Sequence, residues 1–405
     1  MASWEGKLNV LVIGGGMITE EVIFPTVFQE QKLGKVGEVR LATRRAARVA
    51  ELREKFPRNQ FLGYPDPQTE GPEATDEQSY RRALQDLGPH GVVIVATPDH
   101  LHTQMILDAM DAGYDVIVEK PLCLKVAEAH KILAAARQLG RYVLTDYHKR
   151  HDRAIRAAQY RYRKGELGEM LHGHAWIEER REMPLEVFAR WCEESSPFEY
   201  IGVHYVDAYY FITGLVPRRV LALGQKKFLP QHGKDAYDAI QAVIEWEDGS
   251  ALWVQTSWVN SEHNSALTNQ GLQLLGTEGE YWADHKDRHL HFVTQARGFE
   301  HYNPNFFKEY LDWDNPDEVQ YVGYGYDSIV QGLDDVRRIL QATEGKSADE
   351  ALNIRKQMLA QFEKTRALPN QALIGTAVNE AVRLSLAHGS AWVVFDEQMY
   401  PRLVQ

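Results

Sequence analysis

Short apolar runs separated by helix-like stretches dominate the first third of the chain. The apolar runs occupy residues 7–16, 38–45, 91–98, 115–122 and 141–148. Each run except the last is followed by a stretch with helical periodicity. Apolar runs of this kind, bounded by glycine and proline, are typical of strands that are buried on both faces. Their alternation with helices predicts an α/β protein whose first part is a doubly wound parallel sheet.

After residue 170 the pattern changes to longer stretches in which apolar and polar residues alternate. These stretches occupy residues 172–179, 218–227 and 238–259, and the last contains Asp248-Gly249, a typical hairpin turn. Alternation indicates antiparallel strands with one covered face. We therefore expect one domain over residues 1–147 and, over residues 148–405, an α+β domain built on an open, mostly antiparallel sheet. The second domain is expected to start with a basic helix, "RAIRAAQYRYRKGELG".

Composition restricts the classes of function. The chain has 405 residues, of which 44% are hydrophobic, enough for two packed cores. Its net charge of -12 and its lack of a long Lys/Arg block argue against a nucleic-acid partner. Apolar runs fall far short of the roughly 20 residues of a bilayer span, so no membrane partner is expected. Two cysteines, Cys123 and Cys192, form no disulfide framework, which favours the cytoplasm.

A glycine-rich turn follows the first strand, in "VLVIGGGMITEEVI" (residues 10–23). Gly14 permits the tight turn, and Gly16 lets the backbone approach a pyrophosphate at the N-terminus of the helix that begins with Met17 and Ile18. Thr19 stands where a third glycine is usual. A strand before the turn and a helix after it predict a Rossmann dinucleotide-binding domain.

The end of the second strand bears on the choice of nicotinamide cofactor. NAD sites usually have an acid there for the ribose 2'-hydroxyl, whereas an arginine accommodates a 2'-phosphate. The stretch "VRLATRRAAR" (residues 39–48) has no acid and offers Thr43, Arg44 and Arg45. We expect NAD(P), with NADP(H) slightly favoured over NAD(H). The alternative is that Arg44, Arg45 and Arg48 are a solvated helix start.

The stretch "VIVEKPLC" (residues 117–124) ends a buried strand on Glu119, Lys120 and Pro121. In open α/β sheets ligands bind at the carboxyl ends of the strands. Hydride transfer at a carbinol carbon develops charge on its oxygen, and a fixed cation stabilises that charge in the transition state. Lys120 is therefore a candidate for catalysis and substrate binding, and Glu119 for orienting it or contacting the nicotinamide ribose. The alternative for Lys120 is a surface lysine at a strand end.

Two motifs, "VATPDHLH" (residues 95–102) and "VIVEKPLC" (residues 117–124), occur together in this chain. With them the chain resembles the glucose-fructose oxidoreductase and inositol dehydrogenase family, Gfo/Idh/MocA. The resemblance extends through "GELGEM" and "LLGTEGEYWAD". It implies that the turn with Thr97, Pro98, His100 and His102 lies at the nicotinamide. It also implies a C-terminal sheet domain that binds substrate and assembles homodimers or homotetramers, and a sugar, glycoside or cyclic polyol as substrate.

A proton acceptor is predicted in "FEYIGVHYVDAYYFITG" (residues 198–214), because histidine titrates near neutral pH. The family places its histidine at His204, and on a helix Tyr200, His204 and Asp207 share a face. The alternative is a buried histidine among tyrosines.

The chain departs from the family pattern at Tyr200, where many members carry an aspartate. A tyrosine, with a pKa near 10, does not act as a neutral-pH carboxylate. Asp207 or Glu199 could supply the acid that orients His204. Tyr200 could hydrogen-bond the substrate hydroxyl, and a redirected or inactive site is an alternative.

Further substrate contacts are expected at Tyr147, Lys149 and Arg150 in "LTDYHKRHDR", where the family tends to have an arginine pair, and at Trp191, whose ring suits a sugar face. The alternatives are a solvated charge run and a core tryptophan. The histidines of "DHLH" and "HKRH" lack acid or cysteine at ligand spacing, so no metal is expected.

These features predict an NAD(P)-dependent sugar or polyol dehydrogenase with a small carbohydrate substrate. In it Lys120 polarises the oxygen and His204 exchanges the proton, while Tyr200 or Asp207 orients the histidine. One alternative is an NAD(P)-dependent glycosidase that works by transient sugar oxidation. The other is a non-catalytic nucleotide-sensing regulator on the same fold.

Overall fold

The computed structural model describes residues 6–264 and 266–404. They form two compact units. Unit 1 comprises the described residues of Met1–Leu122, Glu128–His148 and Phe307–Gln371; unit 2 comprises those of Cys123–Ala127, Lys149–Phe306 and Ala372–Gln405.

The division into units corrects one expectation. The chain changes unit between His148 and Lys149, close to the expected boundary, but Phe307–Gln371 returns to unit 1. The sequence placed this segment in the second domain. Helical periodicity indicates that a helix buries one face, but it does not tell which sheet that face covers.

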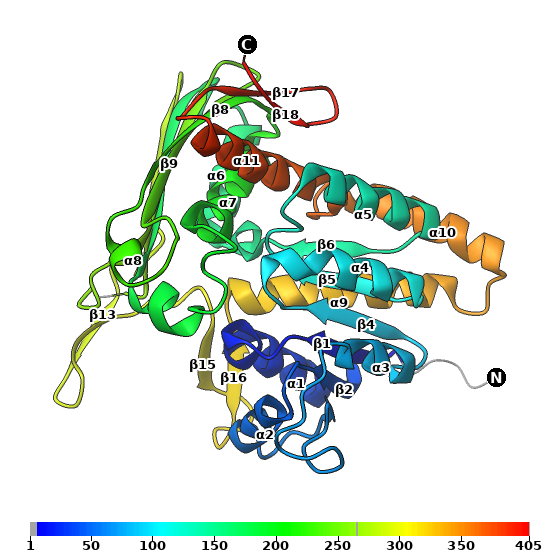
Figure 1. Ribbon diagram of the computed structural model, residues 1–405. Coiled ribbons are helices and arrows are strands. Elements are labelled where there is room, and N and C mark those ends of the chain that lie inside the picture. Colours follow the sequence, from blue (N-terminus) through cyan, green and yellow to red (C-terminus); the bar gives the residue numbers. More distant parts are fainter. Residues whose placement is uncertain (1–5, 265, 405) are drawn as a thin grey trace. The chain divides into compact units, whose positions relative to one another are not determined.

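Unit 1 is built on a six-stranded parallel sheet in the order β3-β2-β1-β4-β5-β6 (Figure 1). The strands are β1 (Leu8–Ile13), β2 (Val36–Ala42), β3 (Leu62–Tyr64), β4 (Gly91–Val95), β5 (Asp115–Glu119) and β6 (Val143–Asp146). The five strands expected from apolar runs are confirmed. β3 was missed because its three residues are too few to show a pattern.

Helices and short helical turns lie between these strands in the chain or follow the last of them. They are η1 (Thr19–Ile23), α1 (Phe24–Lys32), α2 (Ala46–Lys55), α3 (Ser79–Asp86), η2 (Asp99–Leu101), α4 (His102–Asp111), α5 (Val126–Leu139), η3 (His148–His151), α9 (Tyr324–Thr343) and α10 (Ala348–Phe362). Helix α9 packs against β5 and β6. Gly332 allows this close approach, since a Cβ there would lie 2.6 Å from Ile117 Cδ1.

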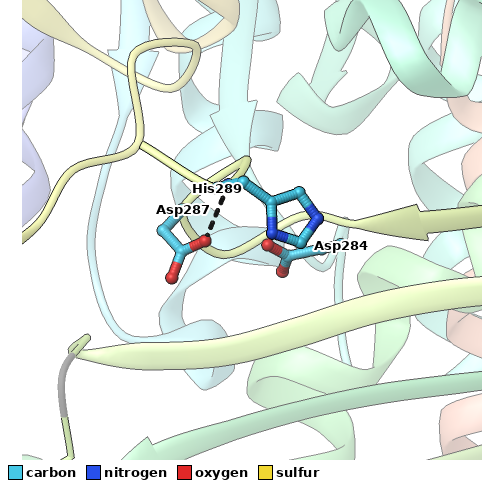
Figure 2. Close-up of side chains that lie close together, drawn as sticks. All are labelled: Asp284, Asp287 and His289. Atoms are coloured by element: carbon cyan, nitrogen blue, oxygen red, sulfur yellow. Dashed lines mark hydrogen bonds between the residues drawn. The ribbon is translucent and has the colours of Figure 1, made fainter. Parts of the chain in front are cut away.

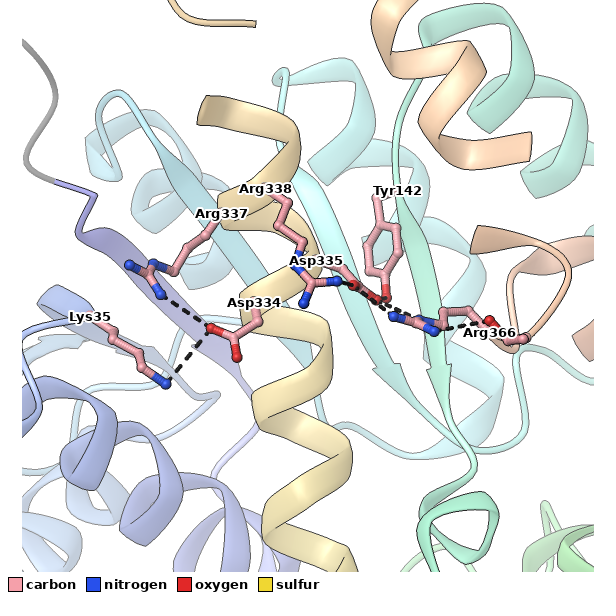
Figure 3. A network of polar contacts seen from close by, with 8 residues as sticks. Lys35, Tyr142, Asp334, Asp335, Arg337, Arg338 and Arg366 are labelled. Atoms are coloured by element: carbon pink, nitrogen blue, oxygen red, sulfur yellow. Dashed lines mark hydrogen bonds and ion pairs between the residues drawn. The ribbon is translucent and has the colours of Figure 1, made fainter. Parts of the chain in front are cut away.

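A polar network fixes α9 to its surroundings (Figure 3). Asp335 is fully buried and accepts hydrogen bonds from Arg366, at 2.8 and 3.0 Å, and from the Tyr142 hydroxyl, at 3.1 Å. Asp334, the preceding residue, instead pairs with Arg337 and Lys35. Burial of Tyr142 and the charge of Asp335 raise the pKa of this tyrosine well above its usual value. The buried carboxylate thus has the charged partner that a low-dielectric position requires.

Unit 2 contains an eight-stranded sheet in the order β12-β11-β7-β10-β9-β8-β17-β18. The strands are β7 (Met170–Arg180), β8 (Pro217–Gln225), β9 (Ala239–Trp246), β10 (Ala251–Asn260), β11 (Thr268–Gly276), β12 (Glu280–Asp284), β17 (Val393–Phe395) and β18 (Pro401–Leu403). All neighbours are antiparallel except β7 and β10, so the mostly antiparallel sheet is confirmed. The hairpin at Asp248-Gly249 joins β9 and β10, and Gly249 has a φ of 87°.

The remaining elements are helices and two hairpins outside the main sheets. They are α6 (Arg153–Arg163), η4 (Met183–Val187), η5 (Phe198–Gly202), α7 (Val203–Thr213), α8 (Phe228–Gln231), β13 (His291–Thr294), β14 (Gly298–His301), β15 (Lys308–Leu311), β16 (Val319–Val322) and α11 (Pro369–Ala387). Helix α6 is the expected basic helix, and Asp152 caps it by accepting from the Ala154 amide. Among the described residues, no helix is long and apolar enough to cross a membrane.

Candidate active site

The turn after β1 has the geometry that a dinucleotide phosphate requires. Gly14 has a φ of 108°, and a Cβ there would lie 2.1 Å from the Ala96 carbonyl oxygen, so only glycine fits. A Cβ on Gly16 would meet nothing within 4 Å, which leaves the backbone of the turn open on that side. Thr19 is buried and donates its hydroxyl to the Gly14 carbonyl at 2.7 Å. Threonine therefore ties the helix to the turn where a third glycine is usual, and Met17 and Ile18 begin the helical segment.

The end of β2 carries two exposed arginines. Arg44 and Arg45 line a hollow of about 280 Å³ together with Thr75 and Glu77. Arg48 differs from them, because its Nε donates to the Gly15 carbonyl at 2.5 Å and its Nη2 to Glu20 at 2.5 Å. Arg48 therefore stabilises the glycine turn. For this residue the alternative of a solvated helix start is wrong.

Thr43, at the start of the same loop, is nearly buried. Its hydroxyl donates to the Arg45 carbonyl at 2.8 Å, and its Cγ2 lies 2.9 Å from where a Cβ on Gly15 would stand. Thr43 thus shapes the loop that presents the two arginines.

His102, expected at the nicotinamide, is completely buried in unit 1. Its Nδ1 lies 2.8 Å from the Pro121 carbonyl oxygen and its Nε2 2.9 Å from the Thr97 carbonyl oxygen. Burial lowers the pKa of His102, which favours the neutral ring. His102 therefore links the loop after β4 to the loop after β5 and holds both in place. His100 is exposed, and Thr97 and Pro98 are half-buried.

Three ionisable side chains meet at the carboxyl ends of β5 and β6. Glu119 and Asp146 are direct partners across the two parallel strands, and Lys120 follows Glu119. Their exposed fractions are 9%, 4% and 8%. Burial, then the charge of Asp146, raises the pKa of Glu119; burial raises the pKa of Asp146, against the hydrogen bond from Ser328 and the charge of Lys120. We infer that this carboxyl pair retains one proton near neutral pH, because two buried carboxylates so close repel each other.

Asp146 was missed by the sequence reasoning. The signal was present, since Asp146 ends the apolar run of β6 as Glu119 ends that of β5, and parallel strands end at one edge of the sheet.

In unit 2, His204 lies in the first turn of α7 and is buried. Tyr200 lies in the preceding π-helical turn, and its ring packs 5.2 Å from Phe188 and 5.3 Å from Trp191, measured between ring centroids. Trp258 adds a third ring at 6.2 Å. Tyr200 and Trp191 are thus members of one aromatic cluster beside the helix that carries His204.

Both acids expected as partners of His204 form ion pairs with arginines. Asp207 accepts two hydrogen bonds from Arg150, at 2.8 and 2.6 Å, and both side chains are buried. Glu199 pairs with Arg383 at 2.5 Å. Burial raises the pKa of Asp207 while Arg150 opposes that shift. These contacts make Asp207 and Arg150 a buried pair that holds α7. The roles expected for both residues at the substrate and at His204 stay predictions.

Lys149 is buried next to residues that follow His204. Its amine donates to Gln270 Oε1 and lies 5.0 Å from the centroid of the Tyr205 ring. Burial lowers the pKa of Lys149 to about 7. The Tyr205 hydroxyl lies 2.9 Å from His285 Nδ1. Lys149 thus belongs to a buried polar chain and is not a solvated charge, and Tyr147 is also buried.

Asp284, Asp287 and His289 form the one group of possible metal ligands found among the described residues (Figure 2). Their ligand atoms lie within 4.8 Å of one another. However, Asp287 also pairs with Lys286, at 3.3 Å, and with His301. Lys286 already supplies positive charge to Asp287, and His301 contacts the same carboxylate, so we assign no metal to this group.

Comparison with known proteins identifies the family. Residues 8–147 match the model described as oxidoreductase family, NAD-binding Rossmann fold, and residues 155–282 match the GFO/IDH/MocA C-terminal domain. The chain belongs to the Gfo/Idh/MocA family of oxidoreductases. The resemblance seen in the sequence motifs is therefore confirmed, as is the combination of a Rossmann domain with a sheet domain.

Individual relatives are distant. The chain is 26% identical over 192 residues to D-glucoside 3-dehydrogenase of Escherichia coli, an alignment that covers 44% of this chain and 55% of that protein. It is 26% identical over 232 residues to scyllo-inositol 2-dehydrogenase (NAD(+)) of Bacillus subtilis, covering 56% and 64%. The chain thus spans between about half and two thirds of the length of these relatives. Among solved structures, GenD2 from gentamicin A biosynthesis in complex with NAD has the same fold, with a TM-score of 0.69, 18% identity and 98% of each chain covered.

Proposed function

We propose that this protein is an NAD(P)-dependent oxidoreductase that moves a hydride between nicotinamide and a secondary hydroxyl or ketone of a sugar, glycoside or cyclic polyol. The observation that carries the proposal is Lys120, a nearly buried cation at the carboxyl end of β5, in the same unit as the open glycine turn. The names of the relatives, a glucoside and an inositol dehydrogenase, support the substrate class.

The proposed chemistry divides between two residues. When bound, the nicotinamide ring accepts or gives the hydride. Lys120 stabilises the negative charge that develops on the reacting oxygen, an effect that is strong where water is excluded. His204 takes the proton of the hydroxyl, or returns it, because imidazole titrates near neutral pH.

Other residues act through these two. Asp207 and Arg150 are positioning residues, since their buried ion pair holds the helix that carries His204. Glu119 orients Lys120 or contacts the nicotinamide ribose. Tyr200 and Trp191 offer aromatic surface, and Tyr147 and Lys149 complete the proposed substrate contacts; a lysine amine with a pKa near 7 can accept a hydrogen bond as well as donate one.

For the cofactor we propose NADP(H) over NAD(H). The support is the hollow beside Arg44 and Arg45, because two exposed guanidiniums suit the extra 2'-phosphate. The test compares kcat/KM for NADP+ and NAD+ in the wild type and in R44A/R45A. The double variant should lose efficiency with NADP+ and keep it with NAD+. Equal losses with both cofactors would contradict the assignment.

A second candidate function is a glycosidase that oxidises its sugar transiently. The observation that favours it is Tyr200, which stands where many family members carry an aspartate. Such an enzyme cleaves a glycoside without net formation of NAD(P)H, because the hydride returns to the product. Release of the aglycone at constant nicotinamide absorbance would therefore separate it from a dehydrogenase.

For the assembly, we propose a homodimer or homotetramer formed through the unit 2 sheet. Leu223, Trp253 and Trp282, on three of its strands, are exposed large apolar side chains. Light scattering should give a mass of two or four chains, and W253E/W282E should shift it toward one.

A further inference from the structure

A hollow lies at the amino ends of β4 and β5, at the sheet edge opposite to Lys120. Its volume is about 290 Å³, and it belongs entirely to unit 1. The lining residues are Gly88, Pro89, His90, Gly91, Ala112, Gly113, Tyr114, Asp115, Leu340 and Arg355. Ligands of a doubly wound sheet bind at the carboxyl ends of its strands, so the nucleotide site does not account for this hollow.

One cation and one anion in the lining neutralise each other. Arg355 donates from Nη1 and Nη2 to the two Asp115 oxygens, at 2.9 and 3.0 Å, and from Nη1 to the Gly140 carbonyl at 3.2 Å. This bidentate pair satisfies the buried carboxylate. The Arg355 Nε makes no hydrogen bond to any residue that the structure describes.

A second arginine beside the hollow has no counter-charge of its own. A Cβ placed on Gly113 would lie 3.6 Å from Nη2 of Arg141, which puts this guanidinium beside one of the residues that line the hollow. Within residues 6–264 and 266–404, the Arg141 side chain makes no hydrogen bond or ion pair, and its Nε is buried. Burial, and the like charge of Arg355, lower the pKa of Arg141 although Asp115 opposes this shift. Two guanidiniums therefore face one carboxylate.

We propose that this hollow binds a small polyanionic metabolite, one that carries phosphate or several carboxylate groups. The buried Nε of Arg141 has no hydrogen-bond partner among the described residues, and the planar donors of a guanidinium match both kinds of oxyanion. The volume exceeds that of an inorganic ion and suits a molecule the size of a sugar phosphate or citrate. The chain has a net charge of -12, so the protein as a whole repels anions. An anion would therefore be bound by the local positive charge of Arg141 and Arg355, which exceeds the negative charge of Asp115.

The proposed site is separate from the site of hydride transfer. Along β5, Asp115 at the hollow is about 13 Å from Glu119 at the other end of the strand, and Lys120 follows one residue later. A ligand here is therefore a second ligand of unit 1, and its binding does not depend on the proposed reaction.

The test is calorimetric titration with citrate, glucose 6-phosphate and inorganic phosphate, each at matched ionic strength and with NADPH present to fill the nucleotide site. R141Q removes the guanidinium, and R137Q, an exposed arginine of α5, is the matched control. At least one anion should bind the wild type and R137Q with equal affinity. Its affinity for R141Q should be lower by about tenfold or more. R141Q should keep its thermal midpoint, because the guanidinium contacts no described partner.

The pattern across the three anions identifies the chemistry. Binding of glucose 6-phosphate without citrate assigns a phosphate group, and the reverse assigns carboxylates. The proposal is overturned if none of the anions binds at matched ionic strength, or if R141Q binds as tightly as the wild type.

Discussion

Replacing Asp146 with asparagine should reduce the loss in the free energy of unfolding that accompanies a rise in pH. Glu119 and Asp146 are paired on adjacent parallel strands and are nearly buried. At the strand spacing of about 4.8 Å and an effective dielectric constant of about 20, two carboxylates repel each other by about 3 kcal/mol. Burial and this repulsion raise the pKa of Glu119 to about 8. Removing the repulsion should lower that pKa by about 2 units.

The sign of the effect on stability follows from proton binding. A carboxyl whose pKa is raised by folding holds its proton in the folded state while the unfolded chain has released it. The free energy of unfolding therefore falls as pH rises from the ordinary carboxyl range to about 8. In D146N this fall should be smaller by at least about 2–3 kcal/mol, because the repulsion is gone and Asp146, whose own pKa is raised by burial, no longer titrates.

The assay is urea unfolding between pH 5 and 9, comparing the wild type, D146N and D111N, whose substituted residue is exposed at the end of α4. D111N should follow the wild type. Parallel curves for the wild type and D146N would refute the reasoning, because the two carboxyls would then not interact.

Three further substitutions test the site. K120M should lower kcat about 100- to 1000-fold while NADPH fluorescence titration shows unchanged cofactor binding; an unchanged kcat would remove Lys120 from the reaction. G14A should abolish cofactor binding, since its Cβ would lie 2.1 Å from the Ala96 carbonyl oxygen, and G34A, which follows α1, has a positive φ and would meet nothing within 4 Å, is the matched control. R150A should destabilise the protein by about 3–5 kcal/mol, because it leaves buried Asp207 unpaired. The exposed substitution R153A should cost little in the same denaturation experiment, and equal losses would contradict a structural role for the pair.

Strands β1, β2, β4, β5 and β6 of the parallel sheet and β7, β8, β9 and β10 of the second sheet were predictable, because each has a local pattern of apolar residues. Strands β3, β11, β12, β17 and β18 were not predicted. The parallel pairing of β7 with β10 was not predictable, since it joins strands that are not consecutive in the chain. The return of Phe307–Gln371 to unit 1 was missed for a similar reason. The close contact of Gly332 with Ile117 that lets α9 lie on the parallel sheet becomes visible only when both elements are in place.

Within the site, residues at strand ends were easier to predict than the partners of charged groups. Glu119, Lys120 and the glycine turn follow from the rule that ligands bind at the carboxyl edge of the sheet. The pairing of Asp207 with Arg150, 57 positions away, and of Glu199 with Arg383 depends on tertiary packing. Sequence spacing along one helix suggested that these acids serve His204, but it could not show that an arginine distant in the chain pairs with each of them.

The most direct test of the central proposal is nicotinamide absorbance after mixing the protein with NADP+ or NAD+ and a panel of cyclic polyols, free sugars and glycosides. We expect a substrate-dependent rise with at least one compound, faster with NADP+, and lost in K120M. A flat trace across the panel, with cofactor binding demonstrated, would contradict the dehydrogenase. Cleavage of a glycoside under those conditions would identify the transient-oxidation glycosidase, and no reaction at all would favour a nucleotide-sensing regulator.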